Sequence, residues 1–265
     1  MKSLAIIGAG NMGGAIYTAV RTALPDLDVA VCDPETGKLT ALKVPSNRRF
    51  SRVNDLFSEL RPNAVLLAVK PQSFEQLAAA IDAGLTNTLV ISIMAGIPIE
   101  RLSRETRSER IIRSMPNLAA IVGKSLTGWI ASPAATAADK AAARSLFRSF
   151  GIEVELATEA DINSITALSG SGPAYYFYLT QLLEEKARAM GFSPADAETI
   201  AQQTIQGAAA VLASKTKTAK EWKQAVTSKG GTTEAALKHL RERQFDHIFA
   251  NAIQKAKERA QELAG

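Results

Sequence analysis

Three glycines near the start of the 265-residue chain have the spacing of a phosphate-binding turn, Gly8-x-Gly10-x-x-Gly13. They directly follow the apolar run Leu4 to Ile7 and precede a stretch with helical periodicity. In that setting the first glycine permits a tight turn, the second lets the backbone approach a pyrophosphate, and the third lets the helix pack on the strand. The pattern predicts a dinucleotide cofactor whose phosphates face the helix N-terminus. The alternative is a glycine-rich turn that binds no ligand.

A carboxylate follows the second predicted strand. Asp33 comes twenty residues after Gly13, where an acid can hydrogen-bond the ribose 2′-hydroxyl of NAD and would repel a 2′-phosphate. This position favours NADH. Two alternatives remain open, because Lys38 or the Arg48-Arg49 pair could turn toward a phosphate, and Asp33 before Pro34 could instead cap the next helix.

Later strand ends supply further candidates. Ala68-Val69-Lys70-Pro71 ends the predicted strand Ala64–Val69, Met94-Ala95-Gly96 ends the predicted strand Leu89–Ile93, and Met115-Pro116-Asn117 ends the predicted strand Arg110–Ser114. All three lie at the carboxyl edge, where an open α/β sheet binds its ligand. Lys70 therefore either contacts the cofactor or another anion, or is an ordinary surface lysine. Asn117 would bring an amide near the nicotinamide.

A polar turn, Val226 to Thr233, stands directly before a predicted helix in the second half of the chain. Its N–H groups and hydroxyls suit a carboxylate, and the alternative is an ordinary capped turn. The other serine-rich segment, Ser169 to Gly172, has no base near it in the sequence, which argues against a nucleophilic serine.

The elements that must position these residues are alternating strands and helices in the first half, the pattern of a parallel sheet. The strands are expected at Leu4–Ile7, Val29–Cys32, Ala64–Val69, Leu89–Ile93, Arg110–Ser114, Leu126–Ala131 and Glu153–Leu156. The helices are expected at Met12–Ala23, Glu35–Leu42, Val53–Leu60, Phe74–Ala83 and Ala137–Phe150.

After about Glu159 helical periodicity continues without a strand-like run. Helices are expected over 174–190, 195–213, 219–226, 232–241 and 246–263, with Ser171-Gly172-Pro173 and Ser193-Pro194 as helix starts. The fold class is therefore α/β, with an N-terminal, mostly parallel sheet and a C-terminal all-helical domain. The predicted boundary lies between residues 158 and 159, giving domains 1–158 and 159–265.

Composition excludes several classes of protein. The net charge of +5 comes from 31 basic and 26 acidic residues, and the arginines from Arg101 to Arg113 alternate with glutamates, as on a solvated helix and turn; neither feature points to nucleic acid. No stretch is long and apolar enough for a membrane span or a signal peptide. A single cysteine and two histidines do not indicate a metal site. A cytoplasmic setting is expected.

Five segments resemble pyrroline-5-carboxylate reductase, the last enzyme of proline biosynthesis, over essentially the whole chain. They are Ile6-Ile7-Gly8-Ala9-Gly10-Asn11-Met12-Gly13, Ala68-Val69-Lys70-Pro71-Gln72, Arg113-Ser114-Met115-Pro116-Asn117, Leu168-Ser169-Gly170-Ser171-Gly172-Pro173-Ala174-Tyr175, and Val226 through Thr233. The last two are more specific than the glycine pattern. The resemblance implies a Rossmann domain, a helical dimerisation domain that completes the neighbour's active site, and often a decamer of dimers.

The resemblance also implies site residues and a cofactor. The cofactor would be lined by Asn11, Met12, Asn54, Ala68, Val69, Lys70, Pro71 and Ala95, and the substrate carboxylate held by Ser228, Gly231, Thr232 and Thr233. Many members use NADPH, whereas Asp33 favours NADH. The chain departs from the family pattern at Leu118-Ala119, where Thr-Pro is usual, and at Lys215 to Ala219, where an acid is common.

The activity implied is reduction of 1-pyrroline-5-carboxylate to L-proline with NADPH or NADH. Because the imine can arrive protonated, no catalytic acid is assigned. The alternatives are a reductase of another cyclic imine on the same scaffold and a cofactor-binding regulator without turnover.

Overall fold

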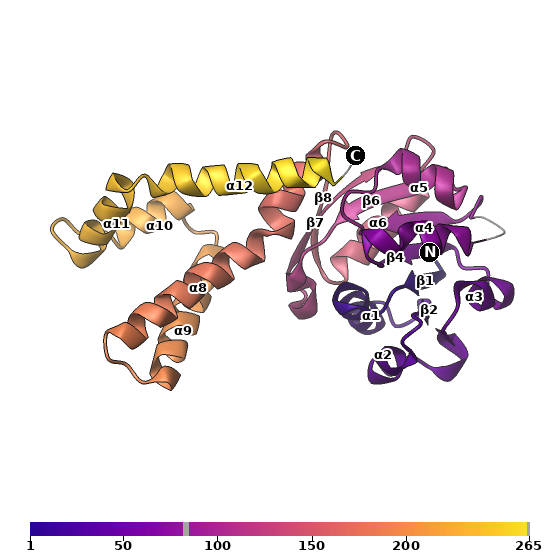
Figure 1. Cartoon of the computed structure of the whole chain (residues 1–265), viewed down its shortest axis with the longest axis horizontal. Helices are drawn as coiled ribbons and strands as arrows, with labels where there is room; N and C mark the ends of the chain where they lie inside the picture. The colour runs from indigo at the N-terminus through magenta and orange to yellow at the C-terminus, as the bar shows by residue number, and fades with distance from the viewer. Residues whose placement is uncertain (82–84, 264–265) are drawn as a thin grey trace. The chain divides into compact units, whose positions relative to one another are not determined.

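The computed structural model describes residues 1–81 and 85–263 and divides into two compact units (Figure 1). The first contains residues 1–171 with the C-terminal stretch from residue 256, and the second contains residues 172–255. Packing therefore groups residues 159–171 with the sheet, whereas the sequence pattern groups them with the later helices. The boundary between residues 158 and 159 stays a prediction.

Within the described residues, one sheet of eight strands has the order β3-β2-β1-β4-β5-β6-β7-β8. Every neighbouring pair is parallel except β6 and β7. The strands are β1 (Ser3–Ile7), β2 (Asp28–Cys32), β3 (Arg49–Phe50), β4 (Ala64–Leu67), β5 (Leu89–Ser92), β6 (Ile111–Met115), β7 (Ser125–Ala131) and β8 (Gly151–Glu155). The predicted mostly parallel sheet is confirmed. The sequence missed β3 because two residues carry no periodicity.

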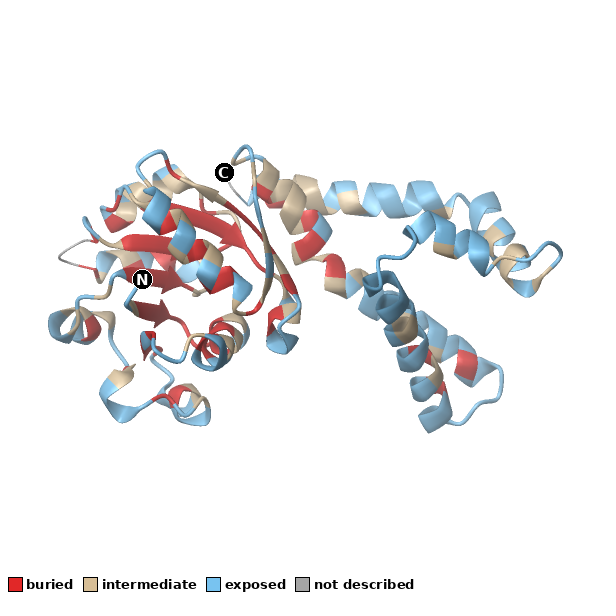
Figure 2. Cartoon of the chain, turned by 180° about the vertical axis from the view of Figure 1, so that it is seen from behind, coloured by how far each residue is buried: buried red, intermediate tan, exposed pale blue. Residues whose placement is uncertain are grey.

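Helices cover both faces of the sheet, so its central strands are apolar at nearly every position. α1 (Asn11–Ala23), α2 (Thr36–Ala41) and α6 (Ala137–Arg148) share one apolar cluster with Leu4 and Ile6. α3 (Val53–Glu59), α4 (Phe74–Ala79) and α5 (Ile99–Thr106) share the other with Ala5 and Ile7. Successive strand residues point to opposite faces, which explains the division. Figure 2 shows the buried residues concentrated on these strands.

Short helical turns complete the first unit. They are η1 (Ser46–Arg48), η2 (Pro71–Ser73), η3 (Leu118–Val122), α7 (Asp161–Ile165) and the π-helical turn η4 (Thr166–Gly170). The helix predicted over Phe74–Ala83 ends at Ala79, and the last residues of that prediction, 82 and 83, lie outside the described part of the chain.

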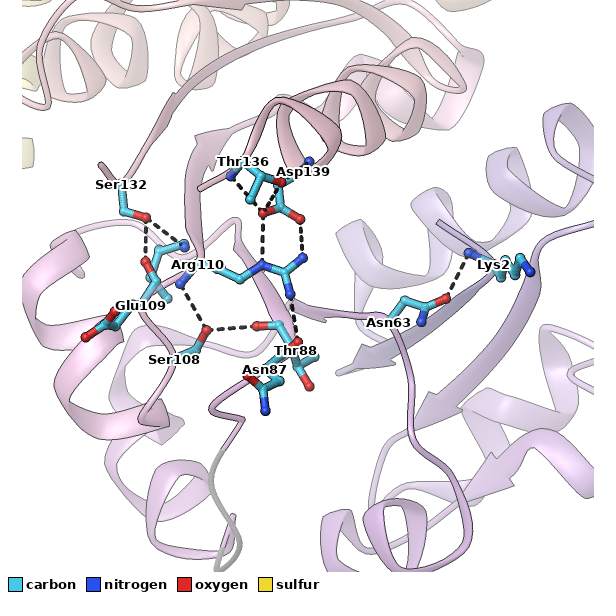
Figure 3. Close-up of polar contacts among 11 residues, drawn as sticks. Lys2, Asn63, Asn87, Thr88, Ser108, Glu109, Arg110, Ser132, Thr136 and Asp139 are labelled. Atoms are coloured by element: carbon cyan, nitrogen blue, oxygen red, sulfur yellow. Dashed lines mark hydrogen bonds and ion pairs between the residues drawn. The ribbon is translucent and has the colours of Figure 1, made fainter. Parts of the chain in front are cut away.

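The arginine series is not uniformly solvated, contrary to the sequence expectation. Arg110 binds both carboxylate oxygens of Asp139 and donates to the carbonyl of Asn87, which fastens the start of β6 to α6 (Figure 3). Arg113 lies on β6 with a side chain only 3% exposed, 2.6 Å from Glu159. Their partners come from distant segments, which charge spacing along the chain does not reveal.

All the secondary-structure elements of the second unit are helices among its described residues, as predicted. It holds α8 (Gly172–Ala189), α9 (Pro194–Ala213), α10 (Ala219–Ala225), α11 (Thr232–Glu242) and the first part of α12 (Phe245–Glu262). Ser193 caps α9 by accepting from the N–H of Asp196, as its sequence predicts. Ser171 does not act as a cap, because its backbone is helical and its N–H donates to the carbonyl of Thr166 in the preceding π turn. Among the described helices, none combines the length and apolarity that crossing a bilayer requires.

Candidate functional site

The glycine turn between β1 and α1 has the geometry that a phosphate-binding loop requires. Gly8 has φ of +102°, and a Cβ there would lie 2.7 Å from the carbonyl oxygen of Ala68. A Cβ at Gly13 would overlap the carbonyl oxygen of Gly8. Both positions therefore require glycine to bring β1, β4 and α1 together.

Gly10 differs, because a Cβ there would meet no described protein atom within 4 Å. The space beside it is thus open, and it lies at the N-cap of α1. That end carries no capping side chain and no acid in its first turn, so its N–H groups stay available to an anion. An open space at the second glycine and an uncapped helix end together fit a pyrophosphate.

A cavity of about 670 Å³ opens at this turn, at the carboxyl ends of β1, β2, β3 and β4. Seven of the thirteen predicted cofactor residues line it: Gly8, Gly10, Asp33, Asn54, Ala68, Val69 and Lys70. The other six lie around it or further along the same edge. Gly13 is buried against Gly8, Asn11 and Met12 begin α1, Pro71 begins η2, Ala95 lies between β5 and α5, and Asn117 caps η3.

Asp33 lies in this cavity but is only 5% exposed. One carboxylate oxygen accepts the N–H of Ala9 in the glycine turn at 2.7 Å, and the other accepts the N–H of Glu35 at 2.9 Å. Asp33 therefore braces the glycine turn as well as lining the site. It does not cap α2, whose N-cap is Glu35, so that alternative reading of the sequence is wrong.

The cations that the sequence offered for a phosphate are engaged elsewhere. Arg48 binds Asp28 at 2.7 Å, and Arg49 donates to the backbone of Val44. Lys38 lines the cavity, but its ammonium lies 2.6 Å from a carboxylate oxygen of Glu35, a hydrogen bond that raises the pKa of Lys38.

Arg52 is the cation that the sequence reasoning missed. It is exposed, lines the cavity, and has no ion-pair partner in the part of the chain that the structure describes. Arg52 comes just after the short strand β3. The sequence pattern did not predict that strand, so nothing in the sequence placed Arg52 at the carboxyl edge of the sheet.

Cys32 lies at the end of β2 and lines the cavity, yet it is unsuited to covalent chemistry. Burial, followed by the neighbouring carboxylates of Asp33 and Asp55, raises the pKa of its thiol to about 12. Because the thiolate is the reactive form, this thiol stays protonated and inert near neutral pH.

Asn117 directs its amide into the protein. Its side-chain oxygen accepts the N–H of Ala119 at 3.1 Å, and its side-chain nitrogen donates to the hydroxyl of Ser169 at 3.0 Å. Ser169 also donates to the carbonyl of Leu126. The amide thus fastens η3 to the π turn, and the hydroxyl of Ser169 is engaged by Asn117 and Leu126.

The predicted carboxylate turn belongs to the second unit. It joins α10 to α11, and Gly230 within it has φ of +74°. Glu234 accepts the N–H of Gly230 at 2.7 Å, which holds the turn closed on itself. α11 begins at Thr232 without a capping side chain, so the N–H groups at Thr232 and Thr233 are available to an acceptor.

Comparison with known proteins assigns the family. A pyrroline-5-carboxylate reductase from Vibrio alginolyticus is 34% identical over 99% of this chain and 97% of its own length. The chain belongs to the pyrroline-5-carboxylate reductase family. The family model for pyrroline-5-carboxylate reductase dimerisation matches residues 159–263, and one described as NADP oxidoreductase, coenzyme F420-dependent, matches residues 3–96.

Solved pyrroline-5-carboxylate reductases share the whole fold. The enzyme from Coxiella burnetii is 32% identical, with a TM-score of 0.88 over 99% of this chain and 98% of that one. The enzyme from Plasmodium falciparum, whose structure has NADP bound, is 26% identical with a TM-score of 0.84 over 99% and 100%. In the family's terms, the glycine turn falls in the stretch matched as an oxidoreductase, and the carboxylate turn in the dimerisation stretch.

Proposed function

We propose that this protein reduces 1-pyrroline-5-carboxylate to L-proline with NADPH or NADH. The observation that carries the proposal is the 34% identity to a named pyrroline-5-carboxylate reductase along nearly the full length of both chains. The glycine turn supports it, since its open space at Gly10 fits a dinucleotide pyrophosphate.

When bound, the reduced nicotinamide supplies the hydride that the imine carbon of the substrate receives. The chain's own residues bind the cofactor and the substrate and orient them toward each other. The glycine turn and the N-terminus of α1 would hold the pyrophosphate, and Asp33 would accept from the adenosine ribose. Lys70 lines the same cavity just after β4. Positioning of this kind is a large part of catalysis in cofactor enzymes.

The substrate carboxylate would bind at Ser228, Gly231, Thr232 and Thr233. Hydroxyls and free N–H groups at the start of an eleven-residue helix suit an anion. Fixing the carboxylate there orients the five-membered ring for hydride transfer. A substrate that arrives with a protonated imine nitrogen needs no acid from the protein.

The chain would assemble as a homodimer through residues 159–265, and the dimers as a decamer, in the cytoplasm. The match to a dimerisation model supports the dimer. Large apolar side chains on α8 support it too, since Tyr176, Phe177 and Tyr178 are each about 60% exposed in the single chain, as expected of side chains that another subunit covers.

The test is oxidation of NADH and of NADPH with freshly prepared 1-pyrroline-5-carboxylate, for wild type and for Thr233→Ala. We expect proline as product, and a KM for the imine raised about tenfold in the variant as one hydrogen bond to a charged group is lost. Thr227→Ala is the matched control, because the hydroxyl of Thr227 is already used in donating to the carbonyl of Lys223, and its KM should stay close to that of wild type. No turnover with either cofactor would contradict the proposal and direct the assay to other cyclic imines.

A further inference from the structure

Asp33 lies where the adenosine ribose is expected, so its charge affects whether a 2′-phosphate can bind there. A free carboxylate at the end of β2 would repel a 2′-phosphate. In this protein both oxygens of Asp33 already accept backbone N–H groups, from Ala9 and Glu35, and the residue is only 5% exposed. Its charge is thereby partly compensated within the fold.

The strand order places Arg52 on the side of the cavity where Asp33 lies, in addition to Lys38, whose Nζ is 3.8 Å from Asp33. The N–H of Asp33 donates to the carbonyl of Phe50, the last residue of β3, at 3.1 Å. Arg52 follows Phe50 by two residues and lines the same cavity. Lys70 follows β4, which β1 separates from β2. Arg52 and Lys38 are therefore the cavity's cations on the ribose side, and Lys70 lies beyond the glycine turn.

The other charges on this side leave Arg52 available. Lys38 is paired with Glu35 at 2.6 Å and lies 3.8 Å from Asp33, so its charge is already offset by two carboxylates. Asp55 also lines the cavity and adds a negative charge. No ion pair or hydrogen bond of the Arg52 side chain occurs among residues 1–81 and 85–263. A guanidinium in this state can bind a phosphate through two parallel hydrogen bonds.

We infer that Arg52 forms a subsite for the 2′-phosphate of NADPH, with the hydroxyl-bearing Ser51 beside it. This inference rests on the proposed cofactor site and names the residue that decides between the two cofactors. Asp33 admits NADH by accepting from the ribose 2′-hydroxyl, and Arg52 admits NADPH by neutralising the added charge. The protein thus accepts both cofactors, and Arg52 sets their ratio.

The experiment measures binding of two fragments, adenosine 2′,5′-bisphosphate and 5′-AMP, by calorimetry at low salt. They differ only in the 2′-phosphate and need neither the nicotinamide nor turnover. The variants are Arg52→Gln, Arg52→Lys and, as the matched control, Arg48→Gln. Arg48 lies four residues away, but its guanidinium is bound to Asp28 and does not line the cavity.

Wild type should bind the bisphosphate about tenfold more tightly than 5′-AMP, since a charge-assisted contact is gained. Arg52→Gln should abolish that ratio while 5′-AMP affinity changes less than about twofold, and Arg52→Lys should keep part of it. Arg48→Gln should retain the wild-type ratio. The ratio should also shrink in about 0.5 M salt, because Arg52 is exposed.

Two outcomes overturn the inference. One is a wild type that binds both fragments equally, and the other is an Arg52→Gln variant that keeps the wild-type ratio. Failure of the proposed function is read separately, from the absence of imine-dependent NADH oxidation by wild type. A protein that reduces the imine with NADH but binds the two fragments equally would contradict only the Arg52 subsite.

Discussion

Glu159→Gln tests whether one carboxylate holds a buried charge in place. Glu159 accepts hydrogen bonds from Arg113 at 2.6 Å and from the N–H of Ile99 at 2.8 Å, both on the same oxygen. Glutamine keeps an oxygen that can accept from Ile99, so the substitution removes the charge with little change of shape. Ile99 begins α5, directly after the turn that carries Ala95.

The magnitude follows from burial. Breaking a buried ion pair costs about 3–5 kcal/mol, because the remaining charge loses its partner. Arg113 is 3% exposed, and its Nε and Nη2 have no hydrogen-bond partner among the described residues. Glu159 is 35% exposed, so water reaches one side of the pair. We therefore expect a loss of about 2–3 kcal/mol, or a Tm lower by roughly 4–12 °C for a chain of this size.

The assay is thermal unfolding followed by circular dichroism, at one protein concentration because subunit association shifts Tm. Glu155→Gln is the matched control. Glu155 is 31% exposed, similar to Glu159, but its partners Lys140 and Arg144 are 37% and 40% exposed. Exposed pairs contribute about 0–1 kcal/mol, so this variant should lose at most a few degrees.

A double variant tests whether the loss of stability comes from the unpaired charge of Arg113. Arg113→Met with Glu159→Gln leaves no buried charge, and should be at least as stable as Glu159→Gln alone. A Glu159→Gln variant that melts no lower than Glu155→Gln would refute the reasoning. So would a double variant less stable than Glu159→Gln alone, since it would make packing of Arg113 the source of the stability.

Three further outcomes are expected. Gly10→Ala should fold normally but bind NADH roughly tenfold more weakly in a fluorescence titration, because its Cβ enters the open pyrophosphate space. Gly13→Ala should instead lose about 1–3 kcal/mol of stability, because its Cβ overlaps the backbone of Gly8. Equal losses of stability in the two variants would contradict this. Burial raises the pKa of Asp139, but hydrogen bonds from Arg110 and the α6 cap outweigh it and hold the pKa below its usual value. The stability it provides is present above about pH 4 and is lost as the pH falls through the folded pKa, so urea unfolding from pH 5 to pH 2 should be less pH-dependent for Asp139→Asn. Cys32, with its raised pKa of about 12, should react with a thiol reagent at pH 8 only after denaturation; rapid reaction of the native protein would contradict its burial.

The sequence predicted the sheet and the glycine turn from contiguous residues. Four buried residues in β4 and four in β5 form largely apolar runs that only a doubly covered strand explains. The spacing of Gly8, Gly10 and Gly13 marks the turn within six consecutive residues. Such patterns need no knowledge of distant partners, so they could be read directly.

Arg52 could not be found in this way. Arg48, Arg49 and Arg52 are similar by sequence, yet of these three Arg52 alone lines the cavity within the described residues. Arg48 is held by Asp28, twenty residues earlier. A long, flexible side chain takes the direction that its neighbours in space allow, and the two-residue strand β3 that sets those neighbours left no periodic signal.

The sequence by itself thus determined the order of the longer strands and helices, the glycine turn and, through resemblance, the family. Only the tertiary structure decided which polar groups remain available: Asp33 braces the glycine turn, Asn117 binds Ser169, and Arg113 is buried against Glu159, 46 residues later. The physical reason is the separation along the chain over which each interaction acts. Hydrophobic periodicity and turn geometry arise between neighbours in the chain, whereas hydrogen bonds and ion pairs of long side chains depend on segments that folding alone brings together.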